Sequence, residues 1–303
     1  MSFRIGGIQQ VGIGVENAET ANAFYKERFG MSVKVFDDAA EAKLMKEYTG
    51  NEVHSRRAIL SLHNQGGGGF EIWQFTSRKP ADAKKFDLGD LGIIAIGMGS
   101  LNNFEGLEIE HQDEECTWFR DPNGNLFHSR KEGLKRGVQS VFVGVKNTAD
   151  SKTLYQTLLH DGKSTDGELS YKGKTYKTLT IRKEKPDKTA FSKILGPFEI
   201  VLVESPEGEN YFDGRYWGDK GFIHLCFDVE EMDNLKGHLE SKGFRFTVDS
   251  KTNFDMGDAG GRFAYVEDAD GTLIELVEVL NFPISKKPKI KIPLHWKILK
   301  PVP

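Results

Sequence analysis

A single histidine lies among the mostly apolar residues of the strand-like segment GFIHLCFDV at residues 221–229. Side chains alternate between the two faces of a β-strand. One face of this segment would carry only apolar residues, and the other would carry His224 together with Phe222, Cys226 and Asp228. The first face predicts packing in a core and the second predicts the wall of a polar cavity. In such a wall His224 is either a hydrogen-bonded residue or a ligand.

The same alternation occurs in IQQVGIGV at 8–15, GIIAIGMGS at 92–100 and VQSVFVGV at 138–145. Aligning the four strands places Gln10, Ala95, Ser140 and His224 at one equivalent position. An amphipathic helical segment follows the first, third and fourth strands, and the first of these helices is expected between an N-cap at Asn17 and a stop at Gly30. The second strand is followed only by a short, degenerate segment.

Each of the four repeats closes with a strand that carries one polar residue among apolar ones. These residues are Glu71, His128, Glu199 and Glu275, and the hairpin turns DPNG at 121–124 and DADG at 268–271 precede two of the strands. Equivalent positions in the two halves of the chain are 128–130 residues apart, which indicates a duplication. Burying a carboxylate is costly. Glutamate or histidine at four equivalent strand positions is therefore hard to explain by packing alone.

With QQVGIGV, GFIHLCFDV and DADGTLIELVE at these positions, the chain resembles the vicinal oxygen chelate superfamily. This superfamily includes glyoxalase I, methylmalonyl-CoA epimerase, extradiol ring-cleaving dioxygenases and fosfomycin or bleomycin resistance proteins. The resemblance implies an α+β fold in which four βαβββ modules form two glyoxalase-like domains with cup-shaped mixed sheets. We expect one domain at 1–133 (modules 1 and 2), a second at 134–283 (modules 3 and 4), and a basic, proline-containing tail at 284–303.

In that superfamily the metal ligands come from the first and last strands of each module. If modules 1 and 4 share a cup, its ligands are Gln10, Glu71, His224 and Glu275, which match the Gln, Glu, His and Glu of glyoxalase I. If modules 3 and 4 share a cup, Glu199 joins His224 and Glu275. The first arrangement is favoured because both lost positions, Ala95 and Ser140, then fall in the other cup.

Imidazole and carboxylate donors suit a divalent metal such as Zn, Ni, Co, Mn or Fe(II). The resemblance implies a metal-dependent lyase or isomerase of glyoxalase type, in which Glu71 or Glu275 moves a proton beside a carbonyl through a metal-stabilised enediolate. One alternative is an extradiol-type ring-cleaving dioxygenase, although no grouping supplies two histidines with Glu275. Another is a non-catalytic small-molecule binding protein of the resistance type. In a third, the cup is inherited and holds no metal.

The aromatic segment ENYFDGRYWGDKG at 209–221 lies just before His224 and carries Arg215 and Trp217. It is either a lid that contacts an anionic substrate through these two residues or a packed loop at the mouth of the cup. The two cysteines, Cys116 and Cys226, lack the spacing of a thiolate zinc site.

Composition places further bounds on function. The 303 residues carry a formal net charge of −4, which gives no broad electrostatic reason to bind nucleic acid. No apolar run approaches the ~20 residues that span a bilayer, and the N-terminal segment does not have the pattern of a signal peptide. We therefore expect a cytoplasmic protein whose partner is a small molecule with adjacent oxygens, without nucleic acid or membrane partners, and with a homodimer as a candidate assembly.

Overall fold

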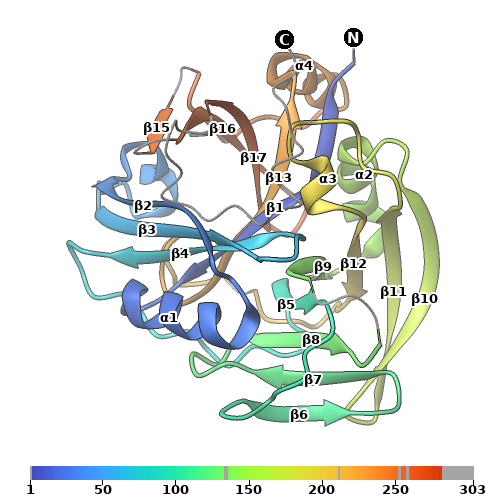
Figure 1. The fold of residues 1–303 in the computed structure, drawn as a ribbon. Helices are drawn as coiled ribbons and strands as arrows, with labels where there is room; N and C mark the ends of the chain where they lie inside the picture. The colour runs from blue at the N-terminus through green and yellow to red at the C-terminus, as the bar shows by residue number, and fades with distance from the viewer. Residues whose placement is uncertain (1, 133–135, 211, 252–253, 257–258, 282–303) are drawn as a thin grey trace.

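The computed structural model describes residues 2–132, 136–210, 212–251, 254–256 and 259–281. Its strands form two curled mixed sheets, and the four predicted repeats are visible in the order of the elements (Figure 1). The predicted tail at 284–303 lies outside the described residues. None of the described helices is long and apolar enough to cross a membrane.

Repeats 1 and 4 build the first sheet, which we call sheet 1. Its strand order is β14-β16-β17-β13-β1-β4-β3-β2, with β15 paired to β16. Repeat 1 contains β1 (Arg4–Gly14), α1 (Ala18–Phe29), β2 (Val33–Glu41), the 3₁₀ helix η1 (Lys43–Tyr48), β3 (Ser55–Leu62) and β4 (Gly69–Phe75). Repeat 4 contains β13 (Gly221–Glu230), α4 (Met232–Ser241), β14 (Val248–Asp249), β15 (Phe254–Met256), β16 (Ala259–Glu267) and β17 (Leu273–Asn281).

Repeats 2 and 3 build the other sheet, sheet 2, in the order β10-β11-β12-β9-β5-β8-β7-β6. Repeat 2 contains β5 (Gly92–Met98), β6 (Glu108–Gln112), β7 (Cys116–Arg120) and β8 (Leu126–Arg130), and it has no helix between β5 and β6. Repeat 3 contains β9 (Val138–Val145), α2 (Thr148–Leu158), β10 (Lys163–Tyr171), β11 (Lys174–Lys183), α3 (Ser192–Leu195) and β12 (Phe198–Glu204). Each sheet thus takes one repeat from residues 1–133 and one from 134–283.

The predicted first helix is confirmed, and local chemistry explains both of its ends. The Asn17 side chain accepts a hydrogen bond from the Thr20 backbone N–H, and Gly30 adopts a left-handed conformation at φ 69°. Both are standard ways to satisfy the free backbone groups at helix ends. The buried residues of the helix include Tyr25 and Phe29, which pack toward the sheets.

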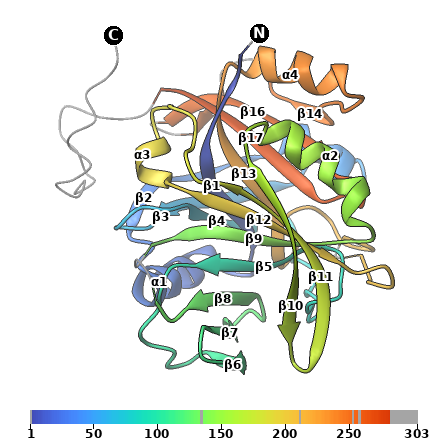
Figure 2. The ribbon, with the colours of Figure 1, turned by 90° about the vertical axis from the view of Figure 1, so that its right-hand side faces the viewer.

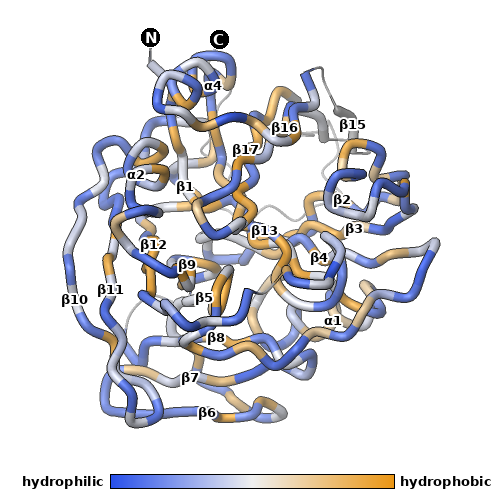
Figure 3. Tube along the Cα trace, turned by 180° about the vertical axis from the view of Figure 1, so that it is seen from behind, coloured by the Kyte–Doolittle hydropathy of each residue, from blue (hydrophilic) through white to orange (hydrophobic). Residues whose placement is uncertain are grey.

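One apolar core joins the two sheets and the three longer helices. It contains the predicted packing face of β1 and β13, for example Val11, Ile13 and Leu225, together with Val141 and Val143 of β9. The hydropathy colouring in Figure 3 shows apolar residues along the central strands, whereas the outer strand β10 is largely hydrophilic. The opposite faces of the central strands are therefore left to line the cups.

Two buried tyrosines form equivalent hydrogen bonds between neighbouring repeats. Tyr25 on α1 donates a 2.5 Å hydrogen bond to Asp121 in the DPNG turn of repeat 2. Tyr155 on α2 donates a 3.0 Å bond to Asp268 in the DADG turn of repeat 4. Both predicted turns place glycine at positive φ, at Gly124 and Gly271. The matching contacts support the duplication seen in the sequence.

Candidate metal centre

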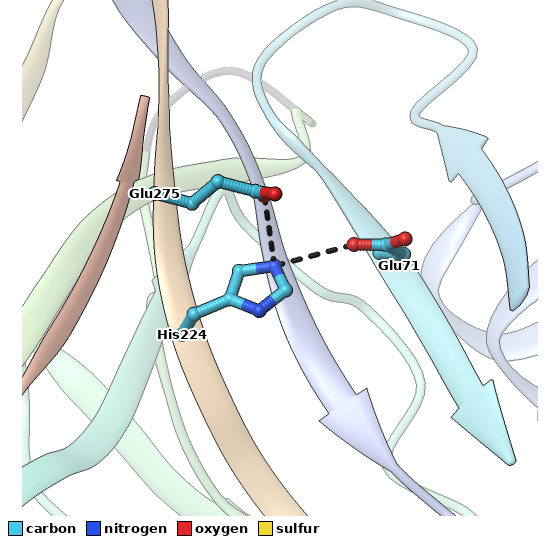
Figure 4. Close-up of side chains that lie close together, drawn as sticks. All are labelled: Glu71, His224 and Glu275. Atoms are coloured by element: carbon cyan, nitrogen blue, oxygen red, sulfur yellow. Dashed lines mark ion pairs between the residues drawn. The ribbon is translucent and has the colours of Figure 1, made fainter. Parts of the chain in front are cut away.

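Four polar side chains converge on the inner face of sheet 1, one from each of its four central strands. Figure 4 shows His224 of β13, Glu71 of β4 and Glu275 of β17 pointing toward one another. His224 Nε2 lies 3.2 Å from Glu71 Oε2 and 3.1 Å from Glu275 Oε2. Gln10 Nε2 on β1 lies 3.3 Å from Glu71 Oε2 and 3.4 Å from Glu275 Oε2. These are the four residues predicted for the arrangement in which repeats 1 and 4 share a cup.

Strand register explains how residues so far apart in sequence meet. Gly12 of β1 pairs with His224 on the antiparallel neighbour β13 and with Glu71 on the parallel neighbour β4. Gln10, two residues earlier on the same face, pairs with Cys226, which in turn pairs with Glu275. Side chains on one face of adjacent strands are neighbours. The alternation read from the sequence therefore places all four donors on the same face of the sheet.

Gly12 leaves the room that the imidazole occupies. A Cβ atom at this position would lie 2.5 Å from His224 Cε1 and 2.7 Å from its Nδ1, and 2.6 Å from Ile223 Cγ1. Such distances are far below ordinary contact, so even a methyl group would displace the ring. The glycine between Gln10 and Gly14 is thus part of the site although it donates no atom to it.

The centre is dry and negatively charged. His224 is fully buried, and Gln10, Glu71 and Glu275 expose 4%, 3% and 7% of their surfaces. Burial disfavours the charged imidazole, but the carboxylates of Glu275 and Glu71 outweigh it and raise the pKa of His224 to about 9. A metal-bound histidine must be neutral, so a divalent cation between these carboxylates would take the place of the proton on His224 Nε2.

Two buried polar atoms at the centre have no hydrogen-bond partner among the described residues. They are Gln10 Oε1 and His224 Nε2, the latter lying close to both carboxylates without hydrogen-bond geometry. A buried polar atom without a hydrogen bond calls for an explanation, and a bound ion is one such explanation. An amide oxygen, an imidazole nitrogen and two carboxylates are donors that Zn²⁺, Mn²⁺, Fe²⁺, Co²⁺ and Ni²⁺ accept. The residues present therefore fit a divalent metal.

A tyrosine that the sequence did not lead us to expect contacts Nδ1 of the His224 imidazole. The Tyr265 hydroxyl on β16 lies 3.3 Å from His224 Nδ1, and its side chain is 1% exposed. Burial and the nearby Glu275 raise the pKa of Tyr265 well above its usual range, so it stays protonated. A partner at Nδ1 leaves Nε2 facing the carboxylates, which is the usual outer-sphere support of a metal-bound histidine. The alternating pattern of the segment RFAYVE, just before the DADG turn, is the sequence signal that could have identified Tyr265 as a residue of the cup.

Two cavities meet at the metal centre, and Glu71, Glu275 and Phe263 line both. The wide chamber has a volume of about 380 Å³ and is lined by Arg56, Trp73 and Trp217, by Tyr265, Ser250 and residues of 41–45. The narrow chamber has a volume of about 90 Å³ and extends from Gln9 and Gln10 toward α3, between β2, β3, β16 and β17. Substrate atoms can therefore reach the carboxylates from two sides.

The two predicted substrate residues have different surroundings. Trp217 is 3% exposed, lines the wide chamber, and packs edge-to-face against Trp73 and in parallel with the His224 ring. Arg215 donates to the Lys220 carbonyl oxygen and lines neither chamber. A role in substrate binding stays a prediction for both residues.

Sheet 2 holds the other predicted ligand positions, but they do not form a comparable centre. Glu199 is ion-paired to Arg130 at 3.0 Å and to Arg182 at 3.7 Å. His128 packs against Trp118 and Phe142, and burial lowers its pKa to about 4. Ala95 and Ser140 supply no charged donor. The alternative in which Glu199 joins His224 would need both in one sheet, whereas the structure places them in different sheets.

One other group of possible ligands exists among the described residues, at His160, Asp161 and Asp187. It is at least partly exposed, and Lys183 already lies 2.5 Å from Asp161 and 3.0 Å from Asp187. A lysine between two carboxylates takes the place that a cation would occupy. This group is therefore better explained as an ion-pair cluster.

Comparison with solved structures confirms the predicted α+β fold of paired glyoxalase-like modules. The chain is similar to a candidate dioxygenase from Bacillus subtilis subsp. subtilis str. 168, with a TM-score of 0.63 and 12% identity over 97% of this chain and 94% of that one. It is also similar to glyoxalase I from Zea mays, with a TM-score of 0.58 and 12% identity over 91% of this chain and 92% of that one. No family model matches the sequence, and no significant match is found among curated proteins.

Proposed function

We propose that the protein is a metal-dependent lyase or isomerase that moves a proton beside a substrate carbonyl. The observation that carries this proposal is the pair of buried carboxylates, Glu71 and Glu275, on two sides of His224. A centre that only held a cation would not need a second base within reach of the bound molecule. The similar solved structures include glyoxalase I and a candidate dioxygenase, so the donor set must decide between the two chemistries.

The residues of the centre have two kinds of role. His224 and Gln10, with one or both carboxylates, would hold the metal. When bound, a divalent metal draws electron density from two adjacent substrate oxygens and makes a hydrogen on the neighbouring carbon more acidic. Glu71 or Glu275 then accepts that proton and returns it to a different carbon, so that no oxidant or reductant is needed. The burial of both carboxylates limits exchange of the proton with bulk water between the two steps.

The donor set favours proton transfer over ring cleavage. Oxygen-activating iron enzymes commonly use two histidines and one carboxylate. Among the described residues this centre has one histidine, two carboxylates and one amide. The extra carboxylate suits a base better than it suits oxygen activation.

Hydrogen exchange tests the proposal with a panel of compounds in place of a single substrate. Metal-loaded protein would be incubated in deuterated water with α-hydroxycarbonyl compounds, thiol hemithioacetals and acyl thioesters, and deuterium would be measured by mass spectrometry. We expect incorporation in the wild type, its loss in both Glu71→Gln and Glu275→Gln, and its retention in Glu199→Gln, the matched change in sheet 2. His224→Ala should in addition lose most of the metal found by elemental analysis. Oxygen uptake with a catechol would instead favour ring cleavage, and tight binding with neither reaction would favour a resistance-type binder.

A further inference from the structure

The narrow chamber has mostly apolar walls beyond its inner end at the metal centre. We propose that it binds an alkyl or aryl group of the substrate, so that the substrate is a chelating pair of oxygens with an apolar substituent on one side. This inference rests on the proposed function, because it assumes that the oxygens lie at the metal. It adds the substrate class and the side of the centre on which the apolar group is bound.

The lining of the chamber changes character along its length. Its inner end carries the polar groups Gln9, Gln10, Glu71 and Glu275. Beyond them, apart from two glycines and Arg262, the walls consist of apolar side chains: Val35, Phe36, Leu60, Leu62, Phe191, Leu195, Phe263, Val277 and Val279. Many of these form one packed cluster that is separate from the main core. A polar substituent placed here would lose its water without gaining hydrogen bonds, whereas an apolar one would gain from burial.

One wall of this chamber comes from the other half of the protein. Phe191 and Leu195 belong to the segment that joins β11 to β12 of sheet 2, and Figures 1 and 2 show α3 lying beside β1 of sheet 1. Leu195 packs so closely on Gly7 that a Cβ there would lie 2.7 Å from Leu195 Cβ. Sheet 2, which has no comparable centre of its own among the residues described, thus supplies part of the cavity of sheet 1.

Hydrogen bonds fix this segment at several points along its length. The Ile5 N–H donates to Asp187 at 2.8 Å, Thr189 Oγ1 donates to Asp228 at 2.6 Å, and the Gly67 N–H donates to the Ile194 carbonyl at 2.9 Å. A wall anchored on both sides of Phe191 keeps its shape when the chamber is empty. Preorganised apolar cavities bind apolar groups with little loss of protein conformational entropy.

The wide chamber is the less suitable place for that group. Its rim carries charged side chains, Glu41 and Lys43, and its interior includes Arg56 and Ser250. Its volume of about 380 Å³ also leaves room for water beside such a group. The narrow chamber, by contrast, has a volume of about 90 Å³ and mostly apolar walls. The two sides of the centre therefore distinguish the two ends of a substrate.

Hydroxamates test the inference, because each presents two adjacent oxygens to a metal and differs only in its substituent. We would measure the affinities of acetohydroxamate, hexanohydroxamate and benzohydroxamate for zinc-loaded protein by calorimetry. Each methylene that becomes buried should strengthen binding about fourfold, so the four additional methylenes of hexanohydroxamate should give up to about 200-fold. The ratio of two affinities in the same protein cancels any change in metal loading.

Two matched tryptophan variants locate the apolar group. Val35→Trp would fill the narrow chamber from its half-buried β2 wall, and Leu44→Trp would introduce the same side chain at the wide chamber, where Leu44 is 47% exposed. We expect the hexanohydroxamate-to-acetohydroxamate ratio to fall at least tenfold in Val35→Trp and to persist in Leu44→Trp. The opposite ranking, or a ratio near one in the wild type while acetohydroxamate binds, would overturn this inference alone. A protein that holds no metal, or whose metal binds no hydroxamate, would overturn the proposed function as well.

Discussion

Replacing Gly12 by alanine should damage the metal centre without removing any donor atom. The added Cβ would lie 2.5 Å from His224 Cε1, whereas ordinary contact begins near 3.4 Å. The imidazole must therefore move by about 0.9 Å, since Gly12 is paired with a neighbouring strand on each side and cannot easily withdraw. Metal–ligand distances tolerate only about 0.2 Å. We expect Gly12→Ala to lose most of its metal.

The equivalent glycine of sheet 2 gives a matched control. Gly97 pairs with Ser140 as Gly12 pairs with His224, and a Cβ at Gly97 would lie 1.8 Å from Ser140 Oγ. Both substitutions overpack a central strand, which typically costs about 1–3 kcal/mol. Both should therefore lower the urea midpoint by similar amounts, but only Gly12→Ala should lower metal content and activity, the latter on the order of 100-fold for a displacement near 1 Å. Equal metal content in the two variants would refute the reasoning.

Three further changes probe the charges and supports around the centre. Glu71→Gln should weaken metal binding in a competition titration while Glu199→Gln leaves it nearly unchanged, and the reverse order would place the metal in sheet 2. Tyr265→Phe, which removes the hydroxyl at His224 Nδ1, should lower metal affinity about 10- to 100-fold; an unaltered affinity would exclude this support. Burial raises the pKa of Asp228 from 3.8 to about 7, so the stability contributed by its protonated form is complete below pH 3.8 and is lost as the pH rises through 7. Relative to wild type, Asp228→Asn should therefore gain about 4 kcal/mol in unfolding free energy between pH 4 and pH 8, and a pH-independent difference in urea titrations would contradict this.

Much of the local structure could be predicted because it depends on signals within a few residues. The Asn17 cap, the Gly30 stop and the two D-x-x-G turns are of this kind, and all occur as expected. The alternation of β13 also placed His224 on the correct face, because a period of two leaves only two choices. Element by element, the chain thus specifies its strands before any long-range contact is known.

The pairing of repeats is not encoded in this local way. Gly12 and His224 pair although more than 200 residues separate them in the sequence. Either repeat 1 or repeat 3 could have paired with repeat 4, because both begin with the same strand pattern. The pairing of repeats 1 and 4 was indicated by the ligand positions that lack a donor residue, because Ala95 and Ser140 both fall in sheet 2. The chamber walls had no such signal. Phe191 and Leu195 lie in a connection between strands, and only the packed structure brings that connection to the centre of another repeat.

The duplication produces two cups, but the buried charged groups of the two cups have different partners. In sheet 2 the carboxylate of Glu199 is neutralised by two arginines, and the aromatic rings of Trp118 and Phe142 cover His128. In sheet 1 the carboxylates keep only one imidazole between them, and a glycine keeps space open beside it. A buried charge without enough partners costs stability. Such a cost is expected where a site is kept ready for a cation and a substrate, and sheet 2 contributes instead through the α3 segment that walls the narrow chamber.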